Sequence, residues 1–354
     1  MKISALKSAM KVVSMITNSS SLVPLYRSVE LSPGRMRACS EYGNLEIAME
    51  CDLPRPVLID CAGVNSVIKT VPSEGDLHCE LKGDRICWSS KTSTGYWLRV
   101  EQSHQIPLIS HPHHPWSPPD DFADALMLAG SAVQSATVSV GLYGIVIEKW
   151  GQQLHLASTN DWGLALATMA GADFPTRKIT IRPPVHKVLS ALLRVCPDAA
   201  LDLTDDGIFF LSDSIRAYFP ASPPLEHDVI GFAHRYARGM KVIDIEASAV
   251  QQFITRAAGL KGKQDGFHVK VGLERGNLTL ALQTESARTD EYLIAEHIHA
   301  GVFTPIVIDG TWLRIPLQHV RSVVLDYLSE NVLVLRGDEH SRMFQFVISG
   351  SQQC

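Results

Sequence analysis

The 354-residue sequence contains no apolar run long enough to cross a bilayer, which requires roughly 20 residues. Runs such as Val138 to Ile147 are much shorter. The segment Met1 to Ile16 carries Lys2, Lys7 and Lys11 within an apolar pattern and has no small-residue cleavage site, so it does not have the pattern of a secretion signal. We therefore expect no membrane insertion and a cytoplasmic location.

The sequence also lacks paired cysteines at metal or redox spacing. No two of its seven cysteines form a C-x-x-C motif. An odd number of unpaired thiols is typical of a reducing compartment, where we expect them to be buried. The seven are Cys39, Cys51, Cys61, Cys79, Cys87, Cys196 and Cys354.

Local catalytic motifs are missing as well: there is no G-x-S-x-G and no H-E-x-x-H. The glycines and lysines of GLKGK at 259–263 lack the spacing of a phosphate-binding loop. His111, His113 and His114 stand among prolines without carboxylate or thiol neighbours at ligand spacing, which favours a stiff linker over a metal site. We predict no catalytic residues, no metal and no cofactor. An unrecognised enzyme remains an alternative that would need a pocket with convergent polar groups.

Three segments of the chain share one order of expected elements. Each begins with an apolar strand, VLID at 57, ITIR at 179 or IVID at 306, and continues with a helix and then paired strands. The segments are Pro56 to Val100, Lys178 to Pro220 and Pro305 to Ile348. Their spacing of roughly 120 to 130 residues predicts one domain per copy.

A matching first half precedes each segment. It consists of a helix, at 3–16, 122–133 or 248–263, and strands of alternating polarity that turn at a glycine near 43, 151 or 276. Each unit is therefore predicted to be an α+β domain with mostly antiparallel strands. The expected domains are 1–110, 117–225 and 240–354, with connectors at His111 to Pro119 and Leu225 to Met240.

The middle unit carries the most specific pattern. The stretch LHLASTNDWGLALATM at 154–169, preceded by LYGIVIE, resembles the signature strand and turn of the bacterial DNA polymerase III sliding clamp family. Phe219 and Pro220 resemble the pair that ends the family's second domain, and FITRAAGL at 253–260 resembles the first helix of the third. The resemblance covers almost the whole chain. Asn160 to Gly163 and the tail GSQQC depart from the family's pattern, as suits a divergent member of the kind that a phage or mobile element encodes.

The resemblance implies three domains of one topology, with helices lining the inside and antiparallel sheets outside. Two chains would close head to tail into a ring that encircles duplex DNA without reading its sequence and tethers the replicative polymerase for processive synthesis. A separate clamp loader would open the ring. Edge strands near Leu77 to Trp88 and His268 to Leu273 are expected to pair across the junction. The alternative is a degenerate clamp-fold interaction platform that no longer encircles DNA.

Charge is distributed unevenly along the chain, although its formal net charge is -5. The six predicted helices (3–16, 62–71, 122–133, 184–195, 248–263 and 311–325) hold ten Lys and Arg and one acid, Asp124, whereas the rest holds 22 basic and 36 acidic residues. Such a separation favours cationic helices that attract the phosphate backbone. The candidate DNA-binding residues are Lys7, Lys11, Lys69, Lys187, Arg194, Arg256, Lys261, Lys263 and Arg321.

The resemblance also implies an apolar groove between the second and third domains that holds short peptides of the polymerase and the loader. Several of its residues equally suit a plain core. A tryptophan in a polar turn, Trp162, is the best candidate for an exposed anchor. The candidate groove residues are Leu142, Thr159, Asp161, Trp162, Gly163, Leu164, Pro220, Leu225, Val347 and Ile348.

Overall fold

The computed structural model divides into two compact units. Unit 1 comprises residues 1–120 and 187–221, and unit 2 comprises residues 121–186 and 222–354. The residues described within them are 1–101, 106–109, 114–133, 144–160, 163–171, 173–175, 178–225, 227–236, 240–260, 267–275, 277–283, 288–294, 297–298, 305–317, 322–329, 332–339 and 342–349.

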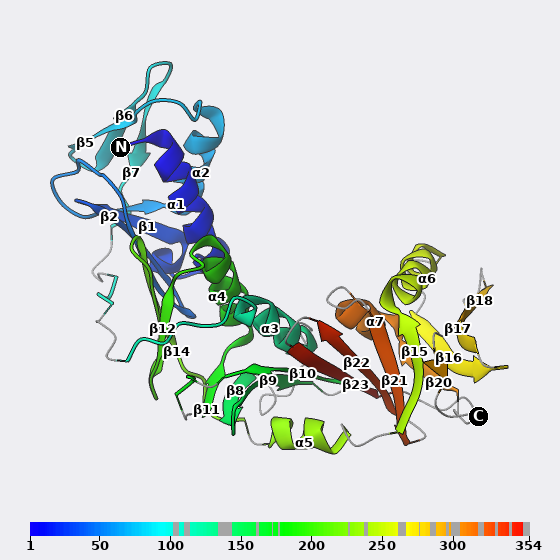
Figure 1. The fold of residues 1–354 in the computed structure, drawn as a ribbon. Helices are drawn as coiled ribbons and strands as arrows, with labels where there is room; N and C mark the ends of the chain where they lie inside the picture. The colour runs from blue at the N-terminus through cyan, green and yellow to red at the C-terminus, as the bar shows by residue number, and fades with distance from the viewer. Residues whose placement is uncertain are drawn as a thin grey trace. The chain divides into compact units, whose positions relative to one another are not determined.

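Unit 1 contains a seven-stranded and a three-stranded sheet, both antiparallel (Figure 1). The larger sheet has the strand order β12-β13-β14-β3-β2-β1-β4, and the smaller has the order β5-β6-β7. The strands are β1 (Ser28–Ser32), β2 (Arg35–Ser40), β3 (Gly43–Ala48), β4 (Val57–Asp60), β5 (His78–Lys82), β6 (Arg85–Ser89), β7 (Thr94–Leu98), β12 (Ala200–Leu203), β13 (Gly207–Leu211) and β14 (Ile215–Pro220).

Helices cover one face of the larger sheet of unit 1. Helix α1 (Ile3–Ile16) packs on β2 and β3 and beside α2 (Cys61–Thr70), which contacts β4. Its apolar residues at helical spacing, such as Leu6, Met10 and Val13, are fully buried, as expected for a helix with one core-facing stripe. A short 3-10 helix, η1 (Pro24–Arg27), contacts β1 and β2. Helix α4 (Pro183–Val195) belongs to unit 1 from Lys187 onward.

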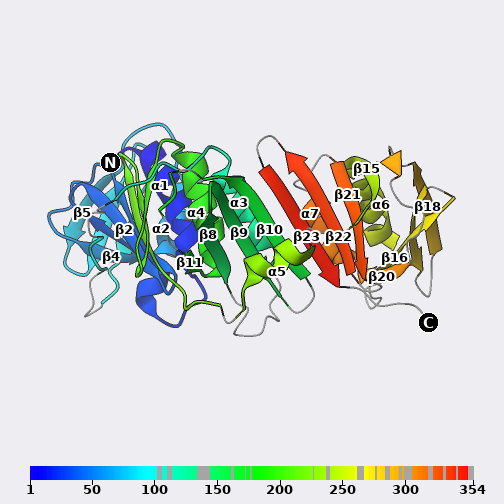
Figure 2. The same cartoon turned by 60° about the horizontal axis from the view of Figure 1, so that its bottom comes forward.

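Unit 2 contains a nine-stranded and a four-stranded sheet (Figure 2). Their orders are β11-β8-β9-β10-β23-β22-β21-β15-β19 and β18-β17-β16-β20. The strands are β8 (Ile145–Trp150), β9 (Gln153–Thr159), β10 (Gly163–Ala170), β11 (Lys178–Ile181), β15 (Met240–Glu246), β16 (His268–Glu274), β17 (Asn277–Gln283), β18 (Arg288–Ile294), β19 (His297–Ile298), β20 (Ile306–Asp309), β21 (Ser322–Ser329), β22 (Val332–Glu339) and β23 (Arg342–Ser349).

Two helices sandwich the middle of the nine-stranded sheet. Helix α3 (Phe122–Ala129) with the 3-10 helix η2 (Gly130–Val133) packs on β9 and β10, and α5 (Val229–Tyr236) contacts the same strands and β23. Figure 1 shows α3 and α5 on opposite faces. Because both faces are covered, β10 is a nearly continuous apolar run. The remaining helices are α6 (Ala247–Leu260), which contacts β15, β18 and β21, and α7 (Gly310–Leu317), which contacts α6 and β20.

Strand order repeats three times along the chain. The first four strands of each repeat are ordered β4-β1-β2-β3, β11-β8-β9-β10 and β20-β16-β17-β18, and the last three are ordered β5-β6-β7, β12-β13-β14 and β21-β22-β23. This agreement in topology supports the sequence repeat. The boundaries of three separate domains stay a prediction.

The helix predictions were mostly confirmed. The predicted helix 3–16 is α1, 62–71 is α2 within one residue, and 184–195 is α4 within one residue. The predicted helix 311–325 was wrong beyond Leu317, because residues from Ser322 onward form β21. The β-branched pair Val323 and Val324 favours a strand there. No helix in the described part of the chain is both long and apolar enough to span a membrane.

Six of the seven cysteines lie in the described residues, and all six are free thiols. Cys39, Cys51 and Cys61 are buried as predicted, whereas the other three described cysteines are only half-buried. Burial raises the pKa of Cys39 to about 11 and that of Cys61 to about 12, so these thiols stay protonated at neutral pH.

Candidate functional site: cationic helices and a covered sheet face

The candidate cations of α1 and α2 differ in the exposure and hydrogen bonding of their side chains. Lys11 and Lys69 are exposed. Lys7 is half-buried, and its Nζ donates hydrogen bonds of 2.9 Å to the Val71 carbonyl and the Ser73 hydroxyl. Lys7 thus satisfies a carbonyl beyond the end of α2, a structural role that the sequence analysis did not predict.

Helix α4 presents cations opposite an apolar stripe. Lys187 and Arg194 are exposed, whereas Val185, Leu189 and Leu192 are fully buried. The two cations stand seven residues apart, so they share one face of the helix. The helix therefore offers positive charge to solvent without disturbing its packing.

On α6, Arg256 is exposed but engaged in an ion pair. Its Nη2 donates to both carboxylate oxygens of Glu291 on β18, at 2.6 and 2.7 Å, and its Nε donates at 3.0 Å. This ion pair neutralises the positive charge of a residue that the sequence analysis proposed for DNA binding. Lys261, Lys263 and Arg321 lie outside the described residues.

The helices as the structure bounds them keep the predicted imbalance. Apart from α5, they hold seven cations and one acid, Asp124. Helix α3 contributes no cation.

Five candidate groove residues lie on or beside neighbouring strands of unit 2. Thr159 pairs with Leu164 between β9 and β10, and Leu164 and Gly163 pair with Val347 and Ile348 of β23. Pro220 ends β14 in unit 1. Leu142, Asp161 and Trp162 lie outside the described residues.

Asn160 fixes the turn between β9 and β10. It is buried, its Nδ2 donates to the Ala132 carbonyl, and its Oδ1 accepts the Gly163 amide at 2.7 Å. The Ser158 hydroxyl donates to the Ala129 carbonyl. Even-numbered residues of β9 therefore face α3 and η2, and odd-numbered residues face α5.

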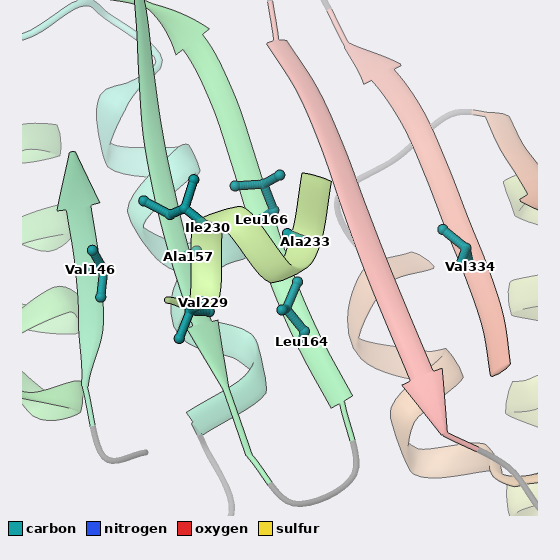
Figure 3. Packing of buried hydrophobic residues seen from close by; sticks show 8 residues of the cluster. All are labelled: Val146, Ala157, Leu164, Leu166, Val229, Ile230, Ala233 and Val334. Carbon is teal, nitrogen blue, oxygen red and sulfur yellow. The ribbon is translucent and has the colours of Figure 1, made fainter. Parts of the chain in front are cut away.

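Leu164 is not an open groove floor. It is 3% exposed and belongs to a cluster in which Leu166 of β10 and Ala157 of β9 pack against Val229, Ile230 and Ala233 of α5 (Figure 3). Leu225, also a groove candidate, packs on this cluster. The chain's own helix thus covers the face assigned to partner peptides.

Sequence reasoning missed α5, because residues 225–240 were interpreted as a connector. A signal was present: Asp228 precedes an amphipathic run, and its Oδ1 accepts the Gly231 amide at 3.0 Å as a helix cap does. Gln345 of β23 is buried and its Nε2 donates to the Ala233 carbonyl at 2.9 Å. The helix is therefore attached by polar as well as apolar contacts.

An aromatic cluster lies at the C-terminal end of α5. The His234 ring stacks on Trp150 of β8, with ring centroids 5.0 Å apart, and meets the His155 ring of β9 edge-on at 4.8 Å. Within the described residues no group of three or more His, Cys, Asp or Glu is placed to hold a metal ion.

Solved structures similar to this one cover nearly the whole chain. The DNA polymerase III subunit beta from Pseudomonas aeruginosa has a TM-score of 0.82 and 13% identity, with 100% of this chain and 99% of that chain covered. The DNA polymerase sliding clamp from Bacillus subtilis has a TM-score of 0.84 and 14% identity, with 100% and 98% covered. The pol III beta of Caulobacter crescentus has a TM-score of 0.83 and 11% identity, with 100% and 99% covered.

No protein-family model matches the sequence, and no curated protein matches it in a sequence search. The likeness therefore rests on the arrangement of elements over the full length of the chain. It confirms the α+β fold class expected from the repeat and the resemblance. The chain is a divergent member of the fold of the bacterial DNA polymerase III beta sliding clamps.

Proposed function

We propose that this chain is a non-enzymatic sliding clamp that forms a homodimeric ring around duplex DNA and tethers the replicative polymerase for processive synthesis. The observation that carries the proposal is a rule of strand pairing between repeats. The third strand of one repeat pairs antiparallel with the last strand of the next, as β3 does with β14 and β10 with β23. In the described sheets this rule leaves β7 and β18 with one free edge each.

A second copy of the chain satisfies both free edges. If β7 of one copy pairs with β18 of the other, two equal junctions close the assembly, as a heterologous interface that completes a rotation does. The sequence-based expectation for the junction strands was wrong for β6 and β16, because each has neighbours on both sides. Unpaired strand edges expose backbone donors and acceptors that can pair with other chains, so the junction also removes two sites of aggregation.

The repeat fixes the register of the proposed junction. Tyr96 stands in its hairpin where Tyr218 stands in the second repeat, and Tyr218 pairs with Asn44. Counting along the strands from Asp60 and Asp309, which both cap the following helix, makes Arg288 the counterpart of Asn44. The expected pairs are Tyr96 with Arg288, Gly95 with Thr289 and Thr94 with Asp290.

Exposure on β7 fits a buried junction. Tyr96 and Leu98 are 54% and 59% exposed, so β7 carries two large hydrophobic side chains that a partner could cover. Tyr218, the counterpart of Tyr96, is half-buried beside β3. Pairing with a second copy would cover Tyr96 in the same way.

Exposed cations on the helices supply the attraction for DNA. Lys11, Lys69, Lys187 and Arg194 are exposed candidates, and Arg256 is exposed as well but pairs with Glu291. Such charges neutralise phosphates without base readout, which lets a ring slide. Because the ring encircles the duplex, it stays on the DNA without binding it tightly. The clamp loader and the polymerase would dock on the sheet face around Thr159, Leu164 and Leu225, where α5 now lies.

The proposal is tested by sealing the ring with disulfides. In a variant with Thr94→Cys and Asp290→Cys, oxidation should link the two copies at both junctions, because facing residues of paired strands are close enough for a disulfide. The matched control carries Thr94→Cys with Leu293→Cys, which is three residues out of register and should not link.

The sealed ring is then formed on closed circular DNA and washed in high salt. We expect it to stay on the circle and to leave when a single cut linearises the DNA. Release from circle and linear DNA alike would contradict encirclement. A stable single chain of 38.9 kDa that never cross-links would instead support the interaction platform.

A further inference from the structure

The most unusual contact outside the proposed junction and the cationic helices is the attachment of α5 to the nine-stranded sheet. The helix has eight residues and is held at two places. Along its length Val229, Ile230 and Ala233 pack on Leu164 and Leu166 (Figure 3). At its C-terminal end the His234 ring contacts the rings of both Trp150 and His155, which also contact each other with centroids 5.3 Å apart.

His155 is held rigidly and in its neutral form. Its side chain is 1% exposed, and its Nδ1 lies 3.0 Å from the Thr168 hydroxyl. Burial, with a smaller contribution from His234, lowers the pKa of His155 to about 4. While the ring stays buried, its protonated form is therefore disfavoured at neutral pH.

The neutral form of the His234 ring is favoured as well. Its Nε2 is buried and has no hydrogen-bond partner among the described residues, so a proton there would lose its hydration without gaining an acceptor from them. Burial lowers the pKa of His234, and Asp228 opposes this shift. The two rings face each other edge to face, so a positive charge on either one disfavours a charge on the other.

The neighbouring carboxylates are engaged elsewhere and do not stabilise a second proton on the two histidine rings. Glu148 of β8 stands opposite His155, but its carboxylate pairs with Lys178 of β11 at 3.3 Å. Asp228 caps the start of α5. The other described titratable or charged groups on these elements include Lys149 of β8, whose Nζ donates to the Phe174 carbonyl at 3.4 Å, His227 and Arg235 beside or on α5, and Arg336 of β22, while β10 and β23 present the uncharged Thr168 and Gln345.

We propose that α5 is a detachable strap over the outer face of this sheet, fastened by the neutral His155 and His234 rings and released when they take up protons. The attached state binds fewer protons than the detached one. Attachment is therefore complete above the ordinary histidine pKa of about 6.5 and weakens as pH falls toward about 4. Apolar packing of Val229 and Ile230 resists release and sets how far the pH must fall.

Release would uncover Ala157, Leu164 and Leu166, the face that the proposed function assigns to partner peptides. This consequence rests on the proposed function, whereas the attachment and its pH dependence do not. The strap would then compete with the partner for one apolar surface.

Hydrogen exchange of the full-length protein tests the strap. At pH 7.5, 6.0 and 5.0, after correction for intrinsic exchange rates, we expect the amides of 229–236 to lose protection by about tenfold or more while β9 and β10 keep theirs. His234→Phe, which keeps the ring stack, should reduce this pH dependence, because one of the two protonation sites is removed while His155 remains. His227→Phe, the matched control at an exposed histidine, should leave it unchanged.

Three outcomes would overturn the strap: equal protection of α5 at all three pH values, full pH dependence in His234→Phe, or loss of protection by the whole sheet together with α5. If His234→Phe does not fold, NMR titration of the imidazole carbons decides, since both rings must titrate below the ordinary range. None of these results bears on ring formation, so failure of the strap and failure of the clamp are distinguishable.

Discussion

Gly43 occupies a position where any side chain would strain the pairing of β3 with β14. Its φ is +150°, and a Cβ there would stand 2.2 Å from the Tyr218 carbonyl oxygen and 2.9 Å from the Phe219 ring. Backbone atoms of a central strand cannot retreat as a flexible side chain can. The close approach of two repeats within unit 1 thus depends on the absence of a side chain at Gly43.

We expect Gly43→Ala to lower the free energy of unfolding by about 2 to 3 kcal/mol, because the new methyl overpacks the strand pair. Gly34→Ala is the matched control, since Gly34 has φ +74° but nothing within 4 Å of its added Cβ. That variant should lose only about 1 kcal/mol. Urea denaturation followed by circular dichroism measures both. Equal losses would mean that the contact with Tyr218 is unimportant.

Among the elements, those with strong local patterns were predictable. Helix α1 was predicted with its bounds because apolar residues recur at helical spacing over four turns. Thr159 and Leu164 were assigned to one candidate groove through the resemblance to the family's signature turn, and the structure pairs them across β9 and β10. In contrast, α5 has only two turns, and its hold on the sheet comes from Leu166, His155 and other residues far away in sequence. Local patterns do not report such tertiary contacts.

Helix α4 gives the clearest test of the cationic helices. Lys187→Gln with Arg194→Gln should lower the affinity for a labelled duplex and reduce the slope of log affinity against log salt by about 0.9 for each phosphate that the variant no longer neutralises. The changes lie on the exposed face, so the unfolding free energy should stay within about 0.5 kcal/mol.

Lys82→Gln with Lys270→Gln, which removes two exposed sheet lysines on β5 and β16, is the control for the change in net charge. Fluorescence anisotropy at stepped salt concentrations compares the two proteins. If both variants weaken binding alike, α4 has no special place in the DNA interface.

For the whole molecule, assembly should depend on the free edge of β7. Tyr96→Lys with Leu98→Lys places two charges on that edge and should turn a dimer into a monomer at micromolar concentration, because charged edges repel strand pairing. Leu22→Lys changes a side chain that is 96% exposed and lies on no sheet edge, so it should leave the dimer intact. Sedimentation equilibrium reports the mass of each variant. A dimer that tolerates the β7 charges would place the interface elsewhere.

Pairing between repeats also governs how the chain folds during synthesis. On the ribosome, β3 is complete at residue 48, yet its neighbour β14 ends only at residue 220. Strand β10 waits longer, since its neighbour β23 ends only at residue 349. The nascent chain therefore carries an unfinished sheet until β23 has been synthesised, and such late, long-range pairing slows folding and leaves edges open to aggregation. A truncation before residue 342 should consequently expose β10 and precipitate.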